Sequence, residues 1–224
     1  MARRAAIRAP SRPPAGERKE KLIAATGRLL RSRGLACVTT RDIAREAKVA
    51  EGALYHHFGD KAELILEVAL HGVGNFREVL ESLRLQVGLH TVEYNLERVL
   101  QSAFDFHYKS APMFCSLFAD QELLRRVRRI MNERCLGPGR EASVLAAYLR
   151  AEQRLGRVSA DTQTGTAAKM MLAMSFNAAM HDNFYGTDGD DAKARRRIRK
   201  TVQALLVGLA PGAPPHYPEK KARR

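Results

Sequence analysis

Apolar residues recur at steps of three and four through most of this chain, which is the spacing of one face of an α-helix. The first such run starts at Glu17, and Gly34 marks its end. Its inward face consists of Leu22, Ile23, Thr26, Leu29 and Leu30. No run alternates apolar and polar residues as a half-buried strand does. The pattern therefore predicts an all-α fold.

The same spacing predicts longer helices in the rest of the chain. One starts near Asp60, because Asp60 and Glu63 have the spacing of a capping box. The others cover residues 91–110, 114–135, 140–155, 162–184 and 191–209. Pro112 is expected to end or bend the helix that precedes it.

A different pattern, two very short helices joined by a tight turn, is predicted at residues 40–47 and 51–58. Lys48, Val49 and Ala50 form the turn. The shared apolar seam consists of Ile43, Ala44, Ala47, Val49, Leu54 and Phe58. This geometry is that of a helix-turn-helix, whose second helix lies in the major groove of DNA.

The outward face of the second short helix has an unusual composition. At about 100° per residue, Gly52, Ala53 and His56 point away from the seam and Tyr55 lies on the flank. Gly52 and Ala53 allow the backbone to approach the groove closely. Because neither side chain donates a hydrogen bond to a base, direct readout falls on His56, Tyr55 and Arg41.

Other residues of this stretch suit the phosphate backbone of DNA. Thr40 and Lys61 lie at predicted helix N-termini, where free N–H groups favour phosphate oxygens. Thr39 or Thr40 is expected to cap the first short helix, and Asp42 suits its positive end.

The stretch "TTRDIAREAKVAEGALYHHFGDKAELI" resembles the DNA-binding region of the TetR family of transcriptional regulators. The resemblance extends over about residues 17–66. It is carried by Thr39, Thr40, Ile43, Ala44, Val49, Leu54, Tyr55, Phe58 and Lys61. It implies that Thr40, Tyr55, His57 and Lys61 contact the DNA backbone, while Arg41 and exposed residues of 51–56 meet bases. The helical wheel places His57 beside the buried face, where only a phosphate at the groove edge is within reach.

Two positions depart from the family pattern, which commonly has Gly where Lys48 stands and Ser where Ala50 stands. Lys48 bears a small cost if its backbone is left-handed, although its amine is able to reach a phosphate. Ala50 removes a helix cap worth about 1 kcal/mol.

The pattern divides the chain into a disordered basic arm (1–16), a helix-turn-helix domain (17–61), a larger helical domain for effector binding and dimerisation (62–210) and a disordered tail (211–224). Two helix-turn-helix domains that bind symmetric half-sites require a dimer. The resemblance places the dimer interface in the last two helices. The expected interface residues are Met171, Ser175, Ala179, Ile198, Val202, Leu205, Leu206 and Leu209. Ordinary packing within one chain is the alternative.

The opposite side of residues 162–184 suggests a pocket for a largely apolar small molecule. It carries Met170, Met174, Asn177 and His181, and flexible thioethers beside a few polar groups suit such a ligand. The facing wall is expected to consist of Leu100, Phe104, His107, Met113 and Phe114. Plain core packing is the alternative. No metal site is expected from His107 and His181, since neither has a partner at ligand spacing.

The charge of the chain supports a nucleic-acid partner. The net charge is +14, and residues 1–61 hold 14 Lys or Arg against 6 Asp or Glu. Arg outnumbers Lys by 28 to 10, a bias that codon usage explains equally well. Arginines in residues 125–129 and 193–200 are interpreted as solvated helix faces, whereas minor-groove binding and non-specific attraction are equal alternatives for the basic arm.

Several classes of protein are not indicated. No apolar run approaches the roughly 20 residues of a membrane span, and no secretory signal is recognised. The three widely spaced cysteines fit reduced thiols in a cytoplasmic protein. No catalytic motif or cofactor-binding motif is found. The sequence predicts a homodimeric regulator, a repressor released from a palindromic double-stranded DNA operator by an apolar effector. The alternative is a non-specific DNA-organising protein without an effector.

Overall fold

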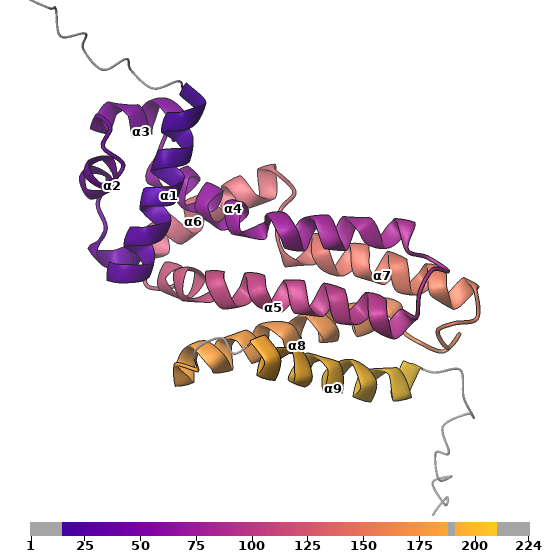
Figure 1. Cartoon of the computed structure of the whole chain (residues 1–224). Coiled ribbons are helices and arrows are strands. Elements are labelled where there is room, and N and C mark those ends of the chain that lie inside the picture. The colour runs from indigo at the N-terminus through magenta and orange to yellow at the C-terminus, as the bar shows by residue number, and fades with distance from the viewer. Residues whose placement is uncertain (1–14, 188–190, 210–224) are drawn as a thin grey trace, which may run out of the picture. The chain divides into compact units, whose positions relative to one another are not determined.

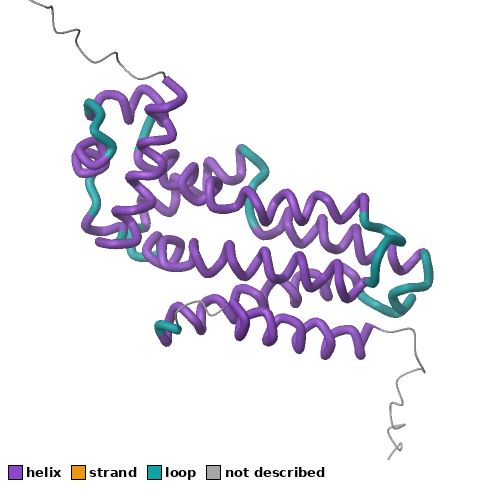
Figure 2. The backbone as a smooth tube through the Cα atoms, in the orientation of Figure 1, coloured by secondary structure: helices purple, strands orange, loops and turns teal. Residues whose placement is uncertain are grey.

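The computed structural model describes residues 15–187 and 191–209, and within them all regular structure is helical (Figures 1 and 2), which confirms the predicted all-α fold. The α-helices are α1 (Ala15–Arg33), α2 (Thr40–Glu46), α3 (Glu51–Phe58), α4 (Lys61–Ser82), α5 (Val92–Leu117), α6 (Gln121–Glu133), α7 (Pro138–Arg154), α8 (Thr164–Tyr185) and α9 (Asp191–Leu209). Two short 3₁₀ helices are η1 (Leu35–Cys37) and η2 (Leu83–Leu85). None of the described helices combines the length and apolar character that crossing a bilayer requires. The predicted tail, and all of the predicted arm except residues 15 and 16, lie outside the described residues.

The described residues form two compact units. The first unit contains residues 15–72 and 112–132, which include α1, α2, α3 and most of α6. The second unit contains residues 73–111 and the described residues after 132, which include α7, α8 and α9. The predicted domain that begins at residue 62 therefore contributes helices to both units, and α6 belongs with the N-terminal helices.

The first unit is organised around one apolar core. Its buried members come from α1, α2, α3, α4 and the turns beside α2, and the largest of them include Leu22, Ile43, Leu54, Phe58 and Leu64. Thr26 is buried among them without cost, because its hydroxyl donates to the carbonyl of Leu22 at 2.7 Å. This core holds three short or medium helices that have too little surface to be stable alone.

The second unit packs α7 against α8 and α8 against α9. Its buried side chains include Leu96 and Leu100 of α5, Leu145 and Leu149 of α7, and Met171 of α8. The hydroxyl of Ser175 on α8 donates to the backbone carbonyl of Leu100 at 3.3 Å, which fixes α8 against α5.

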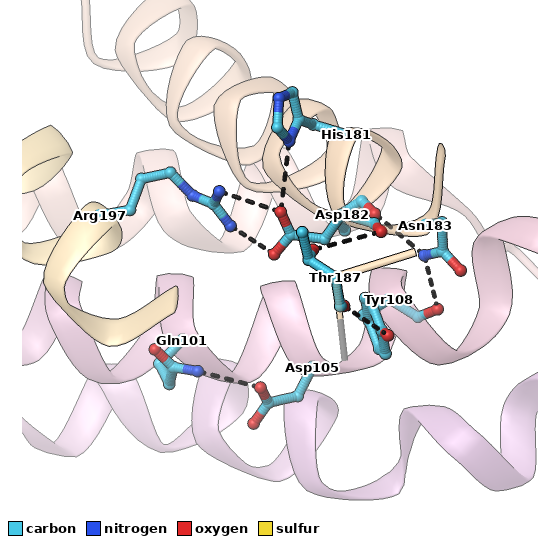
Figure 3. A network of polar contacts seen from close by, with 9 residues as sticks. Gln101, Asp105, Tyr108, His181, Asp182, Asn183, Thr187 and Arg197 are labelled. Atoms are coloured by element: carbon cyan, nitrogen blue, oxygen red, sulfur yellow. Dashed lines mark hydrogen bonds and ion pairs between the residues drawn. The ribbon is translucent and has the colours of Figure 1, made fainter. Parts of the chain in front are cut away.

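Helix α5 continues through Pro112 to Leu117, whereas the sequence predicted an end or a bend at this proline. Proline has no N–H, so the carbonyl four residues earlier loses its helical partner. That carbonyl belongs to Tyr108, and the side-chain amide of Asn183 on α8 donates to it at 3.0 Å (Figure 3). The helix break lies further on, where the carboxylate of Asp120 accepts from the N–H of Leu123 at 3.0 Å as α6 begins.

Two buried ionic networks tie helices of the second unit together. On α8, Asp182 accepts hydrogen bonds from both terminal nitrogens of Arg197 on α9, at 3.0 and 2.5 Å (Figure 3). The Arg197 guanidinium keeps the pKa of this carboxyl below its usual value. At the other network, the fully buried Glu152 accepts from the N–H of Gly88 at 3.1 Å and pairs with Arg157 at 3.1 Å.

Candidate nucleic-acid interface

Helix α2 starts with a capping box made by Thr39 and Asp42. The Thr39 hydroxyl accepts from the N–H of Asp42 at 3.2 Å, and the Asp42 carboxylate accepts from the N–H of Thr39 at 3.1 Å. The hydrogen bonds from Thr39 hold the pKa of Asp42 below its usual value. Thr39 is thus the cap, which leaves Thr40 at the first helical position with its hydroxyl available for other contacts.

The turn between α2 and α3 contains the two residues that depart from the family pattern. Lys48 adopts a left-handed backbone with φ of 56°, the conformation that favours glycine. Ala50 occupies the N-cap of α3 and makes no side-chain capping hydrogen bond. The turn is nevertheless formed, because Val49 packs against the apolar core and its N–H donates to the carbonyl of Ala44 at 3.0 Å.

Helix α3 is seated by two wholly buried side chains, Leu54 and Phe58. Ala44 of α2 is buried at the crossing, where a larger side chain would separate the two helices. Gly59 ends α3 with φ of 66°, a turn that returns the chain to α4. The backbone of α3 is therefore held on the first unit's core, and the opposite face of the helix is exposed.

The exposed face carries the residues expected to read DNA. Arg41, Lys48, Gly52, Tyr55 and His56 are exposed, with Tyr55 at 51% of its full accessible surface. The residues that are only half-exposed are Thr40, Ala53, His57 and Lys61. The hydroxyl of Tyr55 on α3 donates to that of Thr40 on α2 at 3.4 Å, so these two side chains are brought together across the turn.

Glu51 is a member of this face that the sequence analysis did not single out. Its carboxylate accepts a hydrogen bond from the hydroxyl of Thr40 at 3.0 Å and lies 3.8 Å from the guanidinium of Arg41. Residues 40 and 51 both stand at the starts of predicted helices, which was the available signal for their proximity. Helical periodicity within either helix carries no information on a contact between them.

Two residues that were expected to contact phosphates, Lys61 and His57, are partly buried in the protein. The ammonium of Lys61 donates to the carbonyl of Val38 at 2.7 Å, and burial lowers the pKa of this lysine. His57 is half-buried beside Phe58, as the helical wheel indicated, and its Nε2 atom has no hydrogen-bond partner in the described structure. Burial, with the nearby charges of His56, Arg18 and Lys19, lowers the pKa of His57.

An ion pair inside the first unit connects the start of α4 to α6. One oxygen of Asp60 accepts from the N–H of Glu63 at 2.9 Å, as the predicted capping spacing required, and the other pairs with Arg126 of α6. From the sequence, Arg126 was expected to belong to a solvated arginine face. Arg125 and Arg128 are also exposed on this helix, as that interpretation expects.

The side of α8 that the sequence suggested as a dimer interface is buried within this chain, and the side suggested as a pocket wall is exposed. The expected dimer residues Met171, Ser175, Ala179, Ile198 and Val202 are all buried within a single subunit. Leu205 and Leu206 are half-buried, and the side chain of Leu209 lies outside the described residues. These buried residues are therefore occupied by contacts of their own chain. The reason is that α8 carries methionines and small residues on both sides, so its periodicity does not distinguish core from surface.

The expected ligand residues do not surround one cavity. Met170, Met174, Asn177 and His181 are exposed along one side of α8, while Leu100 and Phe104 are buried in the core of the second unit. Met174, Asn177 and His181 line an open hollow whose other walls include Arg197 and Thr201 of α9.

His107 is half-buried in the second unit, and Met113 and Phe114 belong to the first. The ring centroid of His107 lies 5.0 Å from that of Phe106 and 5.3 Å from that of Phe176. Burial lowers the pKa of His107 to about 4.

A short helix seated on a small core, with Arg41, Lys48, Tyr55 and His56 exposed beside a tight turn, defines a helix-turn-helix DNA-binding domain. Residues 22–68 match the bacterial regulatory proteins of the tetR family. The chain therefore carries the DNA-binding domain of TetR-family transcriptional regulators.

Relatives extend the likeness beyond the matched residues. The transcriptional repressor BepR of Brucella suis is 27% identical over 85% of this chain and 93% of its own length. The repressor KstR2 of Rhodococcus jostii is 44% identical over 30% of this chain and 34% of its own length. A solved structure described as a TetR-family regulator from Mesorhizobium loti shares the fold with a TM-score of 0.70, at 17% identity, over 89% of this chain and all of that one.

Proposed function

We propose that this regulator is a homodimeric repressor that binds a palindromic operator and leaves it when a small, largely apolar effector binds. The observation that carries the DNA-binding part is the exposed face of α2 and α3, held on a buried apolar core. In the proposed complex, His56, Tyr55 and Arg41 read base edges, while Thr40, Lys48, His57 and Lys61 contact phosphates. Gly52 and Ala53 allow the helix to approach the groove.

Binding to DNA is tested by fluorescence anisotropy with the DNA that flanks the coding region of this protein. A random duplex of equal length is measured beside it, at about 50 and 200 mM salt. We expect tighter binding to the flanking DNA that persists at the higher salt and is lost in Tyr55→Ala and His56→Ala. Equal, salt-sensitive binding to both duplexes would contradict a specific repressor and support the non-specific organising protein instead.

The exposed side of α8 is the proposed dimer interface, in place of the buried residues named from the sequence. Met170 and Met174 are 52% and 41% exposed on this side, an unusual position for large apolar side chains on a single subunit. Asn177 and His181 continue the same face, and the adjoining hollow reaches Arg197 of α9. A second copy of this face, related by two-fold symmetry, covers these methionines.

A charge placed at the centre of this face tests the interface. Met174→Asp is expected to convert the dimer to a monomer in sedimentation velocity, because two carboxylates would meet across the symmetry axis. Ala147→Asp adds the same charge to an exposed position of α7 and is expected to leave the dimer intact. A Met174→Asp protein that remains dimeric would reject this interface.

The proposal of an apolar effector is supported by structural neighbours. One neighbour is the fatty acid degradation regulator FadR of Bacillus halodurans, with a TM-score of 0.64 at 17% identity over 89% of this chain and 98% of that one. Of the residues named for the pocket, we retain His107, whose neutral imidazole among aromatic rings suits a ligand with one polar group.

Coupling requires that the effector bind one conformation better than the other, which shifts the population away from the DNA-competent state. A panel of free fatty acids added to the operator complex is expected to contain a compound that lowers its anisotropy in a saturable way. Release of His107→Ala by the same compound at the same concentration would contradict the role of this histidine.

A further inference from the structure

We infer that Glu51 lowers the affinity of this regulator for non-specific DNA by holding the DNA-facing hydroxyl and guanidinium groups of α2 and α3 in the free protein. The inference rests on the proposed DNA-binding function and adds a residue that discriminates between DNA sequences. Glu51 is the first residue of α3 and lies between the two helices at the proposed interface.

The hydrogen bonds at this face run in one direction. The hydroxyl of Tyr55 donates to Thr40 at 3.4 Å, and the hydroxyl of Thr40 donates to Glu51 at 3.0 Å. A hydroxyl has a single hydrogen to donate, and a phosphate oxygen only accepts. Tyr55 and Thr40 therefore have no hydrogen left for a phosphate until this chain of bonds is broken.

The negative charge of Glu51 also weakens contacts with phosphates. Its second carboxylate oxygen lies 3.8 Å from the guanidinium of Arg41, whose side chain is 80% exposed and otherwise free to approach a phosphate. An exposed pair at this distance is weak, but the carboxylate also repels every phosphate that comes near. Non-specific binding depends almost entirely on phosphate contacts, so it bears this penalty in full.

A specific DNA site is able to replace the hydrogen bond that the Glu51 carboxylate loses when it releases Thr40. The base edge that donates to Glu or Asp in the major groove is the N4 amino group of cytosine. Where such a group lies under the start of α3, Glu51 exchanges Thr40 for the base, which releases Thr40 for a phosphate and Tyr55 and Arg41 for base edges. Glu51 thus weakens binding to random DNA more than binding to such a site.

The test compares two substitutions that remove one negative charge each. Glu51→Gln keeps the length of the side chain and removes the charge from the network. Glu46→Gln is the matched control, because Glu46 is an exposed carboxylate of α2 that pairs with Arg28, outside the network. Binding to a random-sequence duplex is measured over a range of salt, and thermal denaturation verifies that each variant is folded.

We expect Glu51→Gln to bind the random duplex about fivefold more tightly than wild type, with a salt slope steeper by about 0.9, the value of one additional phosphate contact. Glu46→Gln is expected to behave as wild type. A Glu51→Gln protein that binds random DNA no more tightly than Glu46→Gln would overturn the inference. Failure of the proposed function has a different signature: the wild-type protein would then bind flanking DNA and random DNA equally.

Discussion

The first unit has a polar network on its exposed face, whereas two polar networks of the second unit are centred on buried carboxylates. Tyr55, Thr40 and Glu51 form hydrogen bonds on an exposed face, where water or DNA is able to replace each partner. In the second unit, Asp182 and Glu152 are buried and bonded to arginines of other segments. Surface networks exchange partners at low cost, while a buried charge that loses its partner is strongly destabilising. The comparison assigns adaptability to the exposed face of the first unit and rigidity to the helices of the second unit.

The largest expected effect is the loss of a buried counter-ion. Arg157→Met leaves the carboxylate of Glu152 buried without its cation, which is expected to cost about 3 kcal/mol of stability. The free energy of unfolding is measured with urea. Arg154→Met, an exposed neighbour at the end of α7, is the control and is expected to change stability by at most about 0.5 kcal/mol. Adding Glu152→Gln to Arg157→Met is expected to recover part of the loss, and no recovery would contradict an electrostatic cause.

Stability of the second unit is expected to fall with acid through His107. The folded pKa of about 4 lies below the ordinary value of 6.5, so the unfolded chain binds a proton first as the pH falls. The contribution is complete above pH 6.5, declines between 6.5 and 4, and amounts to about 3 kcal/mol at most. His107→Phe is expected to flatten this part of the stability profile. A profile in which wild type and His107→Phe fall in parallel would refute the assignment.

A neutral network inside the second unit gives a smaller effect. Asn183→Ala removes the donor to the Tyr108 carbonyl that Pro112 leaves without a helical partner. Leaving this half-buried carbonyl unsatisfied is expected to cost about 1 kcal/mol in urea denaturation. Asn132→Ala, at an exposed position of α6, is the matched control. Equal stability of the two variants would mean that water satisfies the carbonyl.

The smallest expected effect is at the turn between α2 and α3, where a substitution is expected to raise stability instead of lowering it. Lys48→Gly relieves the left-handed backbone and is expected to raise thermal stability by about 1 kcal/mol. The same change removes an exposed amine from the reading face, so DNA affinity is expected to fall and the salt slope to become shallower by about 0.9. Gly59→Ala, at φ of 66°, is expected to lose stability instead. A Lys48→Gly protein of lower stability would contradict the strain.

The same contrast explains what could be predicted from the sequence. The helix-turn-helix depends on packing between near neighbours in the sequence, such as Ile43, Leu54 and Phe58 of one core cluster, so its helix bounds and exposed face were predictable. Which face of α8 is buried depends on which helices pack against it. Because α8 carries methionines on both sides, its sequence did not distinguish the buried face from the exposed one. The contacts of Glu51 with Thr40 and of Asp60 with Arg126 join separate elements, which periodicity does not reveal.

The most direct test of the account is selection of duplexes from a randomised DNA pool by the purified full-length protein. The account predicts enrichment of a two-fold symmetric sequence with half-sites about one helical turn, or a multiple of it, apart. It also predicts that His56→Ala loses this enrichment while remaining folded. Recovery of no common sequence by wild type, or of the same sequence by His56→Ala, would contradict sequence reading by the exposed face of α3.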